Sequence, residues 1–343
     1  MRTTDHARTP TFDLPRGSEV GEVIRSAEAE ASCVKRRHLV ELEDLPWWPR
    51  VFRDGETDYF AIALRLAKTY SVIAPRLAAA LKRSRTTQII DLCSGGGGPW
   101  LDLLPALRAE GATVSLCLTD KYPNTAALAK IAGKIPGVRF EAESVNALDV
   151  PERLTGFRTV LTAFHHFRPP EARAILASAV RQGQGIAIVE AASRTPRAFG
   201  MCLGVPLAVW LLSPFIRPFR WSRLFWTYLV PIVPAAVLFD GLVSGFRIYT
   251  PDEMRAMAVD AGGDAFDWEA GIARPPWSLI PIPYLIRLPR HRAATKDRTK
   301  EVSRIGRRFA RRVHACGPPF TGSMVVRRDY DVDPARITLS SAC

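Results

Sequence analysis

The stretch Gln88-Ile89-Ile90-Asp91-Leu92-Cys93-Ser94-Gly95-Gly96-Gly97-Gly98-Pro99-Trp100 decides the fold of this chain. Its first five residues predict a short buried strand. The four glycines that follow predict a tight turn to which a ligand can come close, because glycine has no Cβ. Pro99 is typical of the first turn of a helix, whose N-terminus offers free N–H groups and a positive dipole end. Strand, glycine loop and helix together predict a ligand-binding turn at the edge of an α/β sheet.

Strand and helix patterns alternate around this stretch. The expected strands cover residues 88–92, 113–119, 138–142, 159–164 and 186–190, and the expected helices cover 99–110, 124–134 and 170–181. This alternation predicts a parallel sheet with right-handed crossovers. A helix over 251–261 and strands near 266–271 and 284–288 are expected to complete it. Apolar residues at helical spacing over 57–82, broken at Pro75, predict a helical N-terminal cap.

Two acids stand where expected strands end. Asp91 lies at the end of the first strand and is expected to bind the ammonium group of a ligand, directly or through water. Asp120 ends the second strand, where an acid can accept hydrogen bonds from both hydroxyls of a ribose. Asn146 and Ala147 follow the third strand, at the expected edge of an adenine ring. The predicted ligand-binding residues are Asp91, Cys93, Ser94, Gly95, Gly96, Gly97, Asp120, Lys121, Asn146, Ala147 and Phe164.

The segment Asp91-Leu92-Cys93-Ser94-Gly95-Gly96-Gly97 resembles motif I of the class I S-adenosylmethionine-dependent methyltransferases, and Asp120 matches their second acidic position. The resemblance implies a Rossmann-like fold, S-adenosylmethionine as the cofactor and methyl transfer as the reaction. Two positions depart from the family pattern. Asn146 stands where the family commonly has an acid, and Cys93 stands where it usually has its first glycine.

Three other interpretations remain open. A nicotinamide cofactor of an oxidoreductase fits poorly, because Trp100 occupies the place of the last glycine in the Gly-x-Gly-x-x-Gly pattern. The glycines can serve packing alone, or the chain can be a non-catalytic, membrane-associated protein that keeps the fold. Against the latter, the sequence retains both Asp91 and Asp120.

His165 and His166 follow the fourth expected strand, where open α/β sheets present active-site residues. Either one is a candidate general base that takes a proton from an acceptor hydroxyl or amine, with His166 preferred. The alternative is that they only shape the pocket. No metal is expected, since the neighbouring sequence offers too few further ligands.

An apolar insertion is expected at 199–239, after the fifth strand. Two apolar runs, 199–216 and 225–239, flank the basic, aromatic connector Arg217-Pro218-Phe219-Arg220-Trp221-Ser222-Arg223. Prolines within both runs argue against two full membrane spans and favour an interfacial hairpin on anionic lipid. A lid over the acceptor or an oligomer interface is the alternative. Either version fits a small-molecule or lipid-like acceptor.

Charge and cysteine content complete the expected organisation. The net charge is +13, and much of the excess follows Arg287 without the interleaved aromatics of a nucleic-acid channel, so no nucleic acid partner is expected. Six cysteines without a C-x-x-C pair and a polar N-terminus predict a cytoplasmic protein, bound at most peripherally to the inner face of the membrane. We expect a disordered lead-in over 1–37, the cap over 38–87, the methyltransferase domain over 88–290, and a flexible basic tail over 291–343.

Overall fold

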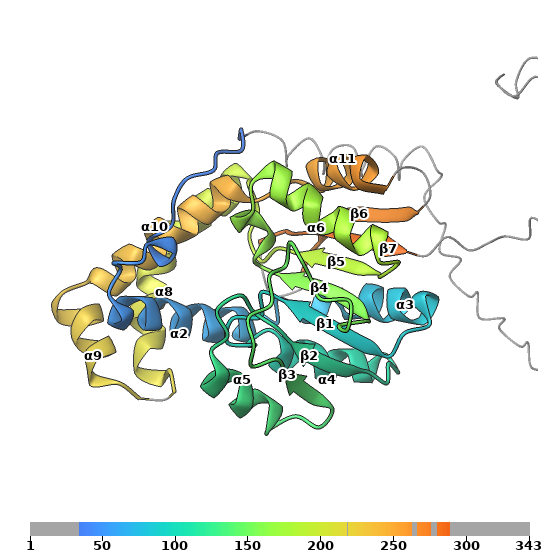
Figure 1. Cartoon of the computed structure of the whole chain (residues 1–343). Coiled ribbons are helices and arrows are strands. Elements are labelled where there is room, and N and C mark those ends of the chain that lie inside the picture. Colours follow the sequence, from blue (N-terminus) through green and yellow to red (C-terminus); the bar gives the residue numbers. More distant parts are fainter. Residues whose placement is uncertain (1–33, 218, 263–265, 276–279, 289–343) are drawn as a thin grey trace, which may run out of the picture. The chain divides into compact units, whose positions relative to one another are not determined.

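The computed structural model contains a seven-stranded sheet with the strand order β3-β2-β1-β4-β5-β7-β6 (Figure 1). The structure describes residues 34–217, 219–262, 266–275 and 280–288, which all belong to one compact unit. The predicted tail over 291–343 and most of the predicted lead-in lie outside the described residues. The strands are β1 Gln88–Leu92, β2 Ser115–Leu118, β3 Val138–Phe140, β4 Phe157–Leu161, β5 Ile186–Val189, β6 Asp267–Ala273 and β7 Ile282–Leu288.

The first five strands are parallel, as predicted. β1 lies between β2 and β4, so the chain reverses its direction of strand addition there. β7 pairs antiparallel with both β5 and β6, so the last two strands form a hairpin that extends one side of the sheet. In open α/β sheets ligands bind beyond the carboxyl ends of the strands where the order reverses. The topology therefore confirms the predicted Rossmann-like methyltransferase fold. A ligand is expected beyond the carboxyl ends of β1, β2 and β4.

Helices cover both faces of the sheet, and each face has its own core. One core joins the sheet to α3 Ala74–Ser84, α4 Trp100–Ala109 and α5 Thr125–Ala132, and the other joins it to α6 Pro169–Arg181 and α11 Pro251–Gly262. Neighbouring strand residues divide between the two: Ile89 packs into the first and Ile90 into the second, both fully buried. This alternation follows from the two-residue period of a strand.

A third, smaller core joins the N-terminal cap to the insertion. α2 Arg50–Leu66 packs against α8 Val205–Leu212 and α10 Ile232–Arg247 around Tyr59, Val209 and Val237 (Figure 1). The remaining elements of this region are η1 Leu42–Asp44, η2 Ser71–Ile73, α7 Pro196–Cys202, η4 Ser213–Phe215, α9 Trp221–Leu224 and the π-helix η5 Phe225–Leu229. The cap and the insertion thus form one helical layer beside the sheet.

Three details differ from the sequence prediction. The break in the cap comes at residues 67–70 rather than at Pro75, which lies in the first turn of α3, where its missing N–H costs nothing. β4 ends at Leu161 rather than at residue 164, because Thr162 has φ +50°. Residues 34–37, assigned to the lead-in, are described, and the Arg36 side chain donates to the carbonyl oxygen of Arg247 at 2.7 Å.

In the described part of the chain, no single helix is both long and apolar enough to cross a membrane. Two bent helix pairs reach the required length and composition together, residues 196–215 with a bend of 42° and residues 221–247 with a bend of 81°.

Candidate functional site

The loop after β1 has the backbone shape that a glycine run predicts. Gly95 and Gly97 have φ +54° and +71°, and Cys93 also has a positive φ, +59°. Side chains other than glycine rarely adopt this conformation. The position at which the resembling family usually has its first glycine is left-handed in this chain, and it carries a cysteine at some conformational cost.

The glycines serve two different purposes. A Cβ on Gly97 would lie 3.0 Å from Ile131 Cδ1 and 3.1 Å from Leu118 Cδ1, so Gly97 is required for packing. A Cβ on Gly95, Gly96 or Gly98 would meet no described atom within 4 Å. The backbone of the loop at these three glycines therefore borders open space.

Asp91 is buried and its carboxylate is used inside the protein. It is 2% exposed, and its two oxygens accept hydrogen bonds from Ser94 Oγ at 2.7 Å and Thr159 Oγ1 at 2.6 Å. Burial raises its pKa to about 6, against the effect of these two hydrogen bonds. Asp91 therefore fixes the start of the glycine loop to β4.

Asp120 and the glycine loop are joined directly. Asp120 Oδ2 accepts a hydrogen bond from the backbone N–H of Gly95 at 2.8 Å, and Oδ1 accepts one from Tyr122 N–H at 2.8 Å. The carboxyl ends of β1 and β2 thus bring the glycines and the second acid together, as predicted. Both Lys121 and Tyr122 are exposed beside this contact.

The loop after β3 reaches the same place. Val145 N–H donates to the carbonyl oxygen of Asp120 at 2.8 Å, and Ser144 Oγ donates to that of Lys121 at 2.6 Å. Asn146 is half-buried, and its side-chain oxygen accepts from Leu148 N–H at 3.1 Å. Ala147 is buried and packs into the core beneath α6 and α11, so the structure does not expose it to a ligand.

The end of β4 is strained at one residue. Thr162 is β-branched and has φ +50°, and its hydroxyl contacts Tyr70 Oη at 2.6 Å and accepts from Ala191 N–H at 3.0 Å. The chain then enters η3 Phe164–His166. Phe164 is fully buried and packs on Tyr249 with ring centroids 5.5 Å apart, so the structure places it in the core.

His165 is held by two carboxylates. It is 2% exposed, and its Nδ1 lies 2.7 Å from Glu190 Oε2 while its Nε2 lies 3.6 Å from Glu41 Oε1. Burial acts to lower the pKa of His165, but the charges of Glu190 and Glu41 outweigh burial and raise it above the ordinary value.

His166 lies beside His165, with ring centroids 4.4 Å apart, and faces the other oxygen of the same glutamate. Its Nε2 lies 3.7 Å from Glu41 Oε2, and its Nδ1 lies 3.1 Å from both Asp44 Oδ1 and Arg247 Nη2. Arg247 also pairs with Asp44 at 2.6 Å. Burial favours the neutral acid of Asp44, but hydrogen bonds from His166 and Arg247 hold its pKa below the ordinary range.

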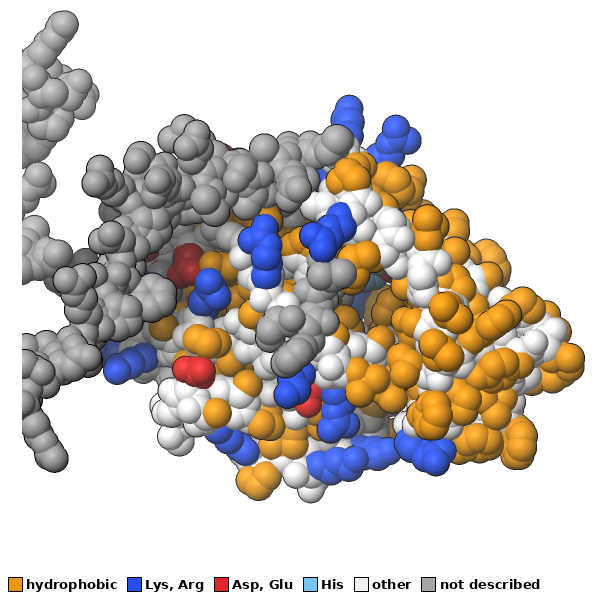
Figure 2. All heavy atoms as spheres, turned by 180° about the vertical axis from the view of Figure 1, so that it is seen from behind, with side chains coloured by type: hydrophobic (Ala, Val, Ile, Leu, Met, Phe, Trp, Pro, Cys, Tyr) orange, Lys and Arg blue, Asp and Glu red, His pale blue; other side chains and the backbone are white. Residues whose placement is uncertain are grey.

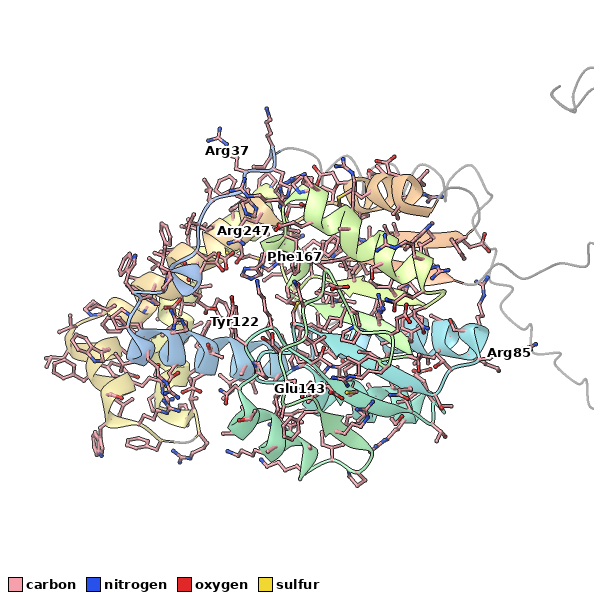
Figure 3. The ribbon with its side chains drawn as sticks, in the orientation of Figure 1. Arg37, Arg85, Tyr122, Glu143, Phe167 and Arg247 are labelled. Atoms are coloured by element: carbon pink, nitrogen blue, oxygen red, sulfur yellow. The ribbon has the colours of Figure 1, made fainter. Side chains whose placement is uncertain are left out.

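Glu41, Asp44, Glu190 and Arg247 were not predicted as site residues. Figure 3 shows Arg247, Phe167 and Tyr122 on one side of the molecule and Arg85, which precedes β1, on the other. Glu190 is the last residue of a predicted strand and so had a usable signal. Glu41 and Arg247 had none, because the fold alone brings them together. No metal was expected, because the sequence near the histidines offers too few further ligands; the fold brings a distant one to them, and ligand atoms of Glu41, His165 and His166 lie within 4.8 Å of one another.

A second cluster of acids lies next to η1, the element that carries Asp44. Glu43, Glu56 and Asp240 approach one another within 4.8 Å, and both oxygens of Asp240 accept from backbone N–H groups of η1. Burial, together with neighbouring carboxylates, raises the pKa of Glu43 to about 7 and that of Glu56 to about 8. The cluster ties η1, which ends at Asp44, to α2 and α10.

No protein-family model matches this chain, and no curated protein matches its sequence. Among solved structures the chain is similar, at low sequence identity, to several methyltransferases. The plantazolicin methyltransferase BpumL, in complex with SAH, is 10% identical with a TM-score of 0.47 over 79% of this chain and 100% of that one. Human N-acetylserotonin methyltransferase, in complex with SAM, is 14% identical with a TM-score of 0.42 over 80% and 68%. An O-methyltransferase family protein from Burkholderia thailandensis is 16% identical with a TM-score of 0.42 over 79% and 70%.

Proposed function

We propose that this chain is an S-adenosylmethionine-dependent methyltransferase. The observation that carries the proposal is the hydrogen bond between Gly95 N–H and Asp120 Oδ2, which joins a glycine loop after β1 to an acid after β2. Such an acid accepts ribose hydroxyls in dinucleotide-binding sheets of related architecture. When bound, S-adenosylmethionine supplies a sulfonium methyl group.

The residues present fit an amino-acid nucleoside. The open space beside Gly95 and Gly96 admits a ligand against the backbone, where side chains would fill it. When the ligand binds, Asp120 gives up its hydrogen bond from Gly95 N–H and accepts hydrogen bonds from the ribose hydroxyls. Asp91 keeps the loop in place through its hydrogen bonds to Ser94 and Thr159. Asn146, in the loop bonded to Asp120, lies at the adenine edge.

Glu41, His165 and His166 form the acceptor side in this proposal. They lie at the carboxyl end of β4, next to β1, and carry groups that bind and deprotonate a hydroxyl or amine. The polarity of the cluster favours an acceptor that reacts through oxygen or nitrogen and presents an apolar body to the neighbouring helices.

Calorimetric titration tests the cofactor directly. We expect S-adenosylmethionine and S-adenosylhomocysteine to bind with micromolar affinity, and Asp120→Ala to weaken both by about 10-fold or more. Asp149→Ala, an exposed acid on the loop after β3, is the matched control and is expected to bind normally. Binding of NADH in place of the adenosyl ligands would support an oxidoreductase instead, and no binding at all would favour a non-catalytic protein.

We also propose that the insertion contacts an anionic membrane surface. Twelve of the eighteen large apolar side chains that are exposed in the described residues lie between 203 and 239. Figure 2 shows the apolar surface that they form, with basic side chains nearby. Trp210, Trp221 and Tyr228 belong to this surface, and such side chains favour the headgroup region. The exposed Arg197 and Arg217 suit anionic lipid.

Vesicle flotation tests this contact. The full chain is expected to float with phosphatidylglycerol-containing vesicles and to remain unbound with neutral ones. The double variant Leu211→Glu/Leu229→Glu is expected to lose flotation, whereas Leu66→Glu, also at an exposed leucine but outside the insertion, retains it. A wild-type protein that stays unbound and elutes as a dimer would overturn membrane contact and assign the surface to self-association.

A further inference from the structure

The two histidines aim the same ring atom at one carboxylate. His165 Nε2 lies 3.6 Å from Glu41 Oε1 and His166 Nε2 lies 3.7 Å from Glu41 Oε2, both beyond hydrogen-bond distance. Ligand atoms around one tetrahedral Zn²⁺, each bonded at about 2.0–2.1 Å, lie roughly 3.4 Å apart. These two separations end on different oxygens of Glu41, and one ligand atom from each of the three residues lies within 4.8 Å of the other two, so the three atoms would close in by up to about 1.4 Å to reach the tetrahedral spacing.

The opposite ring atoms carry the partners that ligating histidines have. Nδ1 of His165 lies 2.7 Å from Glu190, and Nδ1 of His166 lies 3.1 Å from Asp44. A histidine that binds a metal donates its other ring N–H to a carboxylate, which fixes the tautomer and leaves the ligating nitrogen with a free lone pair. Arg247 Nη2 is the alternative partner of His166 Nδ1, at 3.1 Å, and the metal-bound state uses Asp44 instead.

Glu41 is held in place for this task. It is 3% exposed, and its Oε1 accepts from Ser244 Oγ at 2.8 Å and lies 3.2 Å from Arg247 Nη1. Both partners come from α10. The carboxylate therefore cannot swing away from the histidines without breaking two contacts to that helix.

The charge around these atoms favours a cation. Glu41, Asp44 and Glu190 bring three carboxylates, against which stand the guanidinium groups of Arg247 and, at the rim, Arg36. With neutral histidine rings the cluster keeps an excess of negative charge. A buried excess of this kind must be neutralised by a proton or by a metal ion.

We propose that Glu41, His165 and His166 bind one Zn²⁺-class divalent metal ion, with a fourth position open to water or to an oxygen of the methyl acceptor. Two histidines and a glutamate with an open position are a ligand set of catalytic zinc sites. The part of the proposal that concerns the acceptor rests on the proposed methyltransferase function, and metal binding itself does not. An acceptor oxygen bound to the metal loses its proton more readily than a free hydroxyl does.

Cobalt titration of the full chain tests the site. After treatment with EDTA and its removal, Co²⁺ is expected to give visible d–d absorption that saturates at one equivalent per chain and is displaced by Zn²⁺. Glu41→Gln and His166→Ala are expected to weaken Co²⁺ binding by about 10-fold or more. Glu152→Gln and His38→Ala, which remove the same kinds of group from positions outside both acid clusters, are the matched controls.

Each outcome decides the proposal. Folding of every variant is checked by circular dichroism, and Asp44→Asn, which alters the partner of His166 Nδ1 and of Arg247 but removes no proposed ligand, provides a second, milder variant. No Co²⁺ absorption, or equal affinity in wild type and Glu41→Gln, would overturn the metal site and leave a protonated His165 to neutralise the cluster. Calorimetry with S-adenosylhomocysteine on the same samples separates the two claims, because it reports the cofactor whatever the metal result.

Discussion

Glu190 holds His165 at two atoms: its Oε2 lies 2.7 Å from Nδ1, and its Oε1 accepts the backbone N–H of the same residue at 2.9 Å. Glu190 follows β5 and His165 follows β4, and these strands are neighbours in the sheet. The two contacts fix both the position of the backbone and the direction of the ring. The orientation of His165, which we propose to face the methyl acceptor, is thereby set by a contact between the ends of two neighbouring strands.

Substitution Glu190→Gln is expected to lower the pKa of His165. Glu190 is one of the two carboxylates that raise it, whereas burial and the charge of Arg247 lower it and both remain in the variant. We expect a fall of about 1 unit or more. NMR titration of the imidazole in metal-free protein measures it. Glu143→Gln, on the surface, is the control, and an unchanged pKa in the Glu190 variant would contradict this account of the pair.

Gly97→Ala is expected to destabilise the protein by about 2 kcal/mol, because φ is +71° there and the added Cβ would crowd Ile131 and Leu118. Urea unfolding measures the loss. Gly200→Ala is the matched control: it lies in α7 with space around its Cβ, so alanine is expected to stabilise the helix by about 0.5–1 kcal/mol. Equal effects at the two positions would show that the positive φ does not matter.

Gly96→Val is expected to separate binding from stability. No described atom lies within 4 Å of a Cβ at this position, and its φ is not in the left-handed range, so the melting temperature should change by no more than about 2 °C. The added side chain enters the space that we assign to the cofactor, and affinity for S-adenosylhomocysteine should fall by about 10-fold or more. If calorimetry instead gives wild-type affinity, the cofactor does not lie against this part of the loop.

Glu56→Gln is expected to make stability less dependent on pH. Burial raises the pKa of Glu56 to about 8, against about 4.3 in the unfolded chain. Its contribution to stability is therefore fully present below about pH 4.3 and is lost as pH rises toward 8.

At pH 8 the Glu56→Gln variant should accordingly melt at a higher temperature than wild type, by about 2–4 °C for each kcal/mol recovered, and at pH 5 the difference should be smaller. Thermal unfolding at both values measures it, with the exposed Glu152→Gln as control. A variant that is less stable than wild type at pH 8 would mean that the charged form of Glu56 is bound by a cation.

The sequence predicted all five strands of the parallel sheet, but β4 covers 157–161 rather than 159–164, and Arg158 and Thr159 interrupt its apolar pattern. The order of the strands in the sheet could not be predicted from the sequence alone. β6 and β7 were expected to complete the sheet, but only tertiary pairing shows that β7 lies between β5 and β6 and runs antiparallel to both.

The candidate site likewise contains residues that the sequence predicted and residues that only the tertiary structure brings together. Asp91, the glycines and Asp120 lie close in sequence to strand ends, so their convergence follows from the topology of a parallel sheet. Glu41 meets Ser244 across 203 residues of sequence, and Arg247 meets Asp44 across the same separation. Periodicity and spacing carry no record of such contacts. Thr162 shows the local limit: an extended-looking segment contains a left-handed residue that propensity disfavours.

The contacts that join η1 to α10 have a consequence for how the protein is made. Glu41 leaves the ribosome early, but Ser244 and Arg247 are synthesised only after the five parallel strands are complete. The contacts between η1 and α10 can therefore form only after the parallel strands have been synthesised, whereas the loops after β1 and β2 are already complete. Removal of η1 from the finished protein is expected to release Asp240 and Arg247 from their partners there and to leave the hydrogen bond between Gly95 and Asp120 in place.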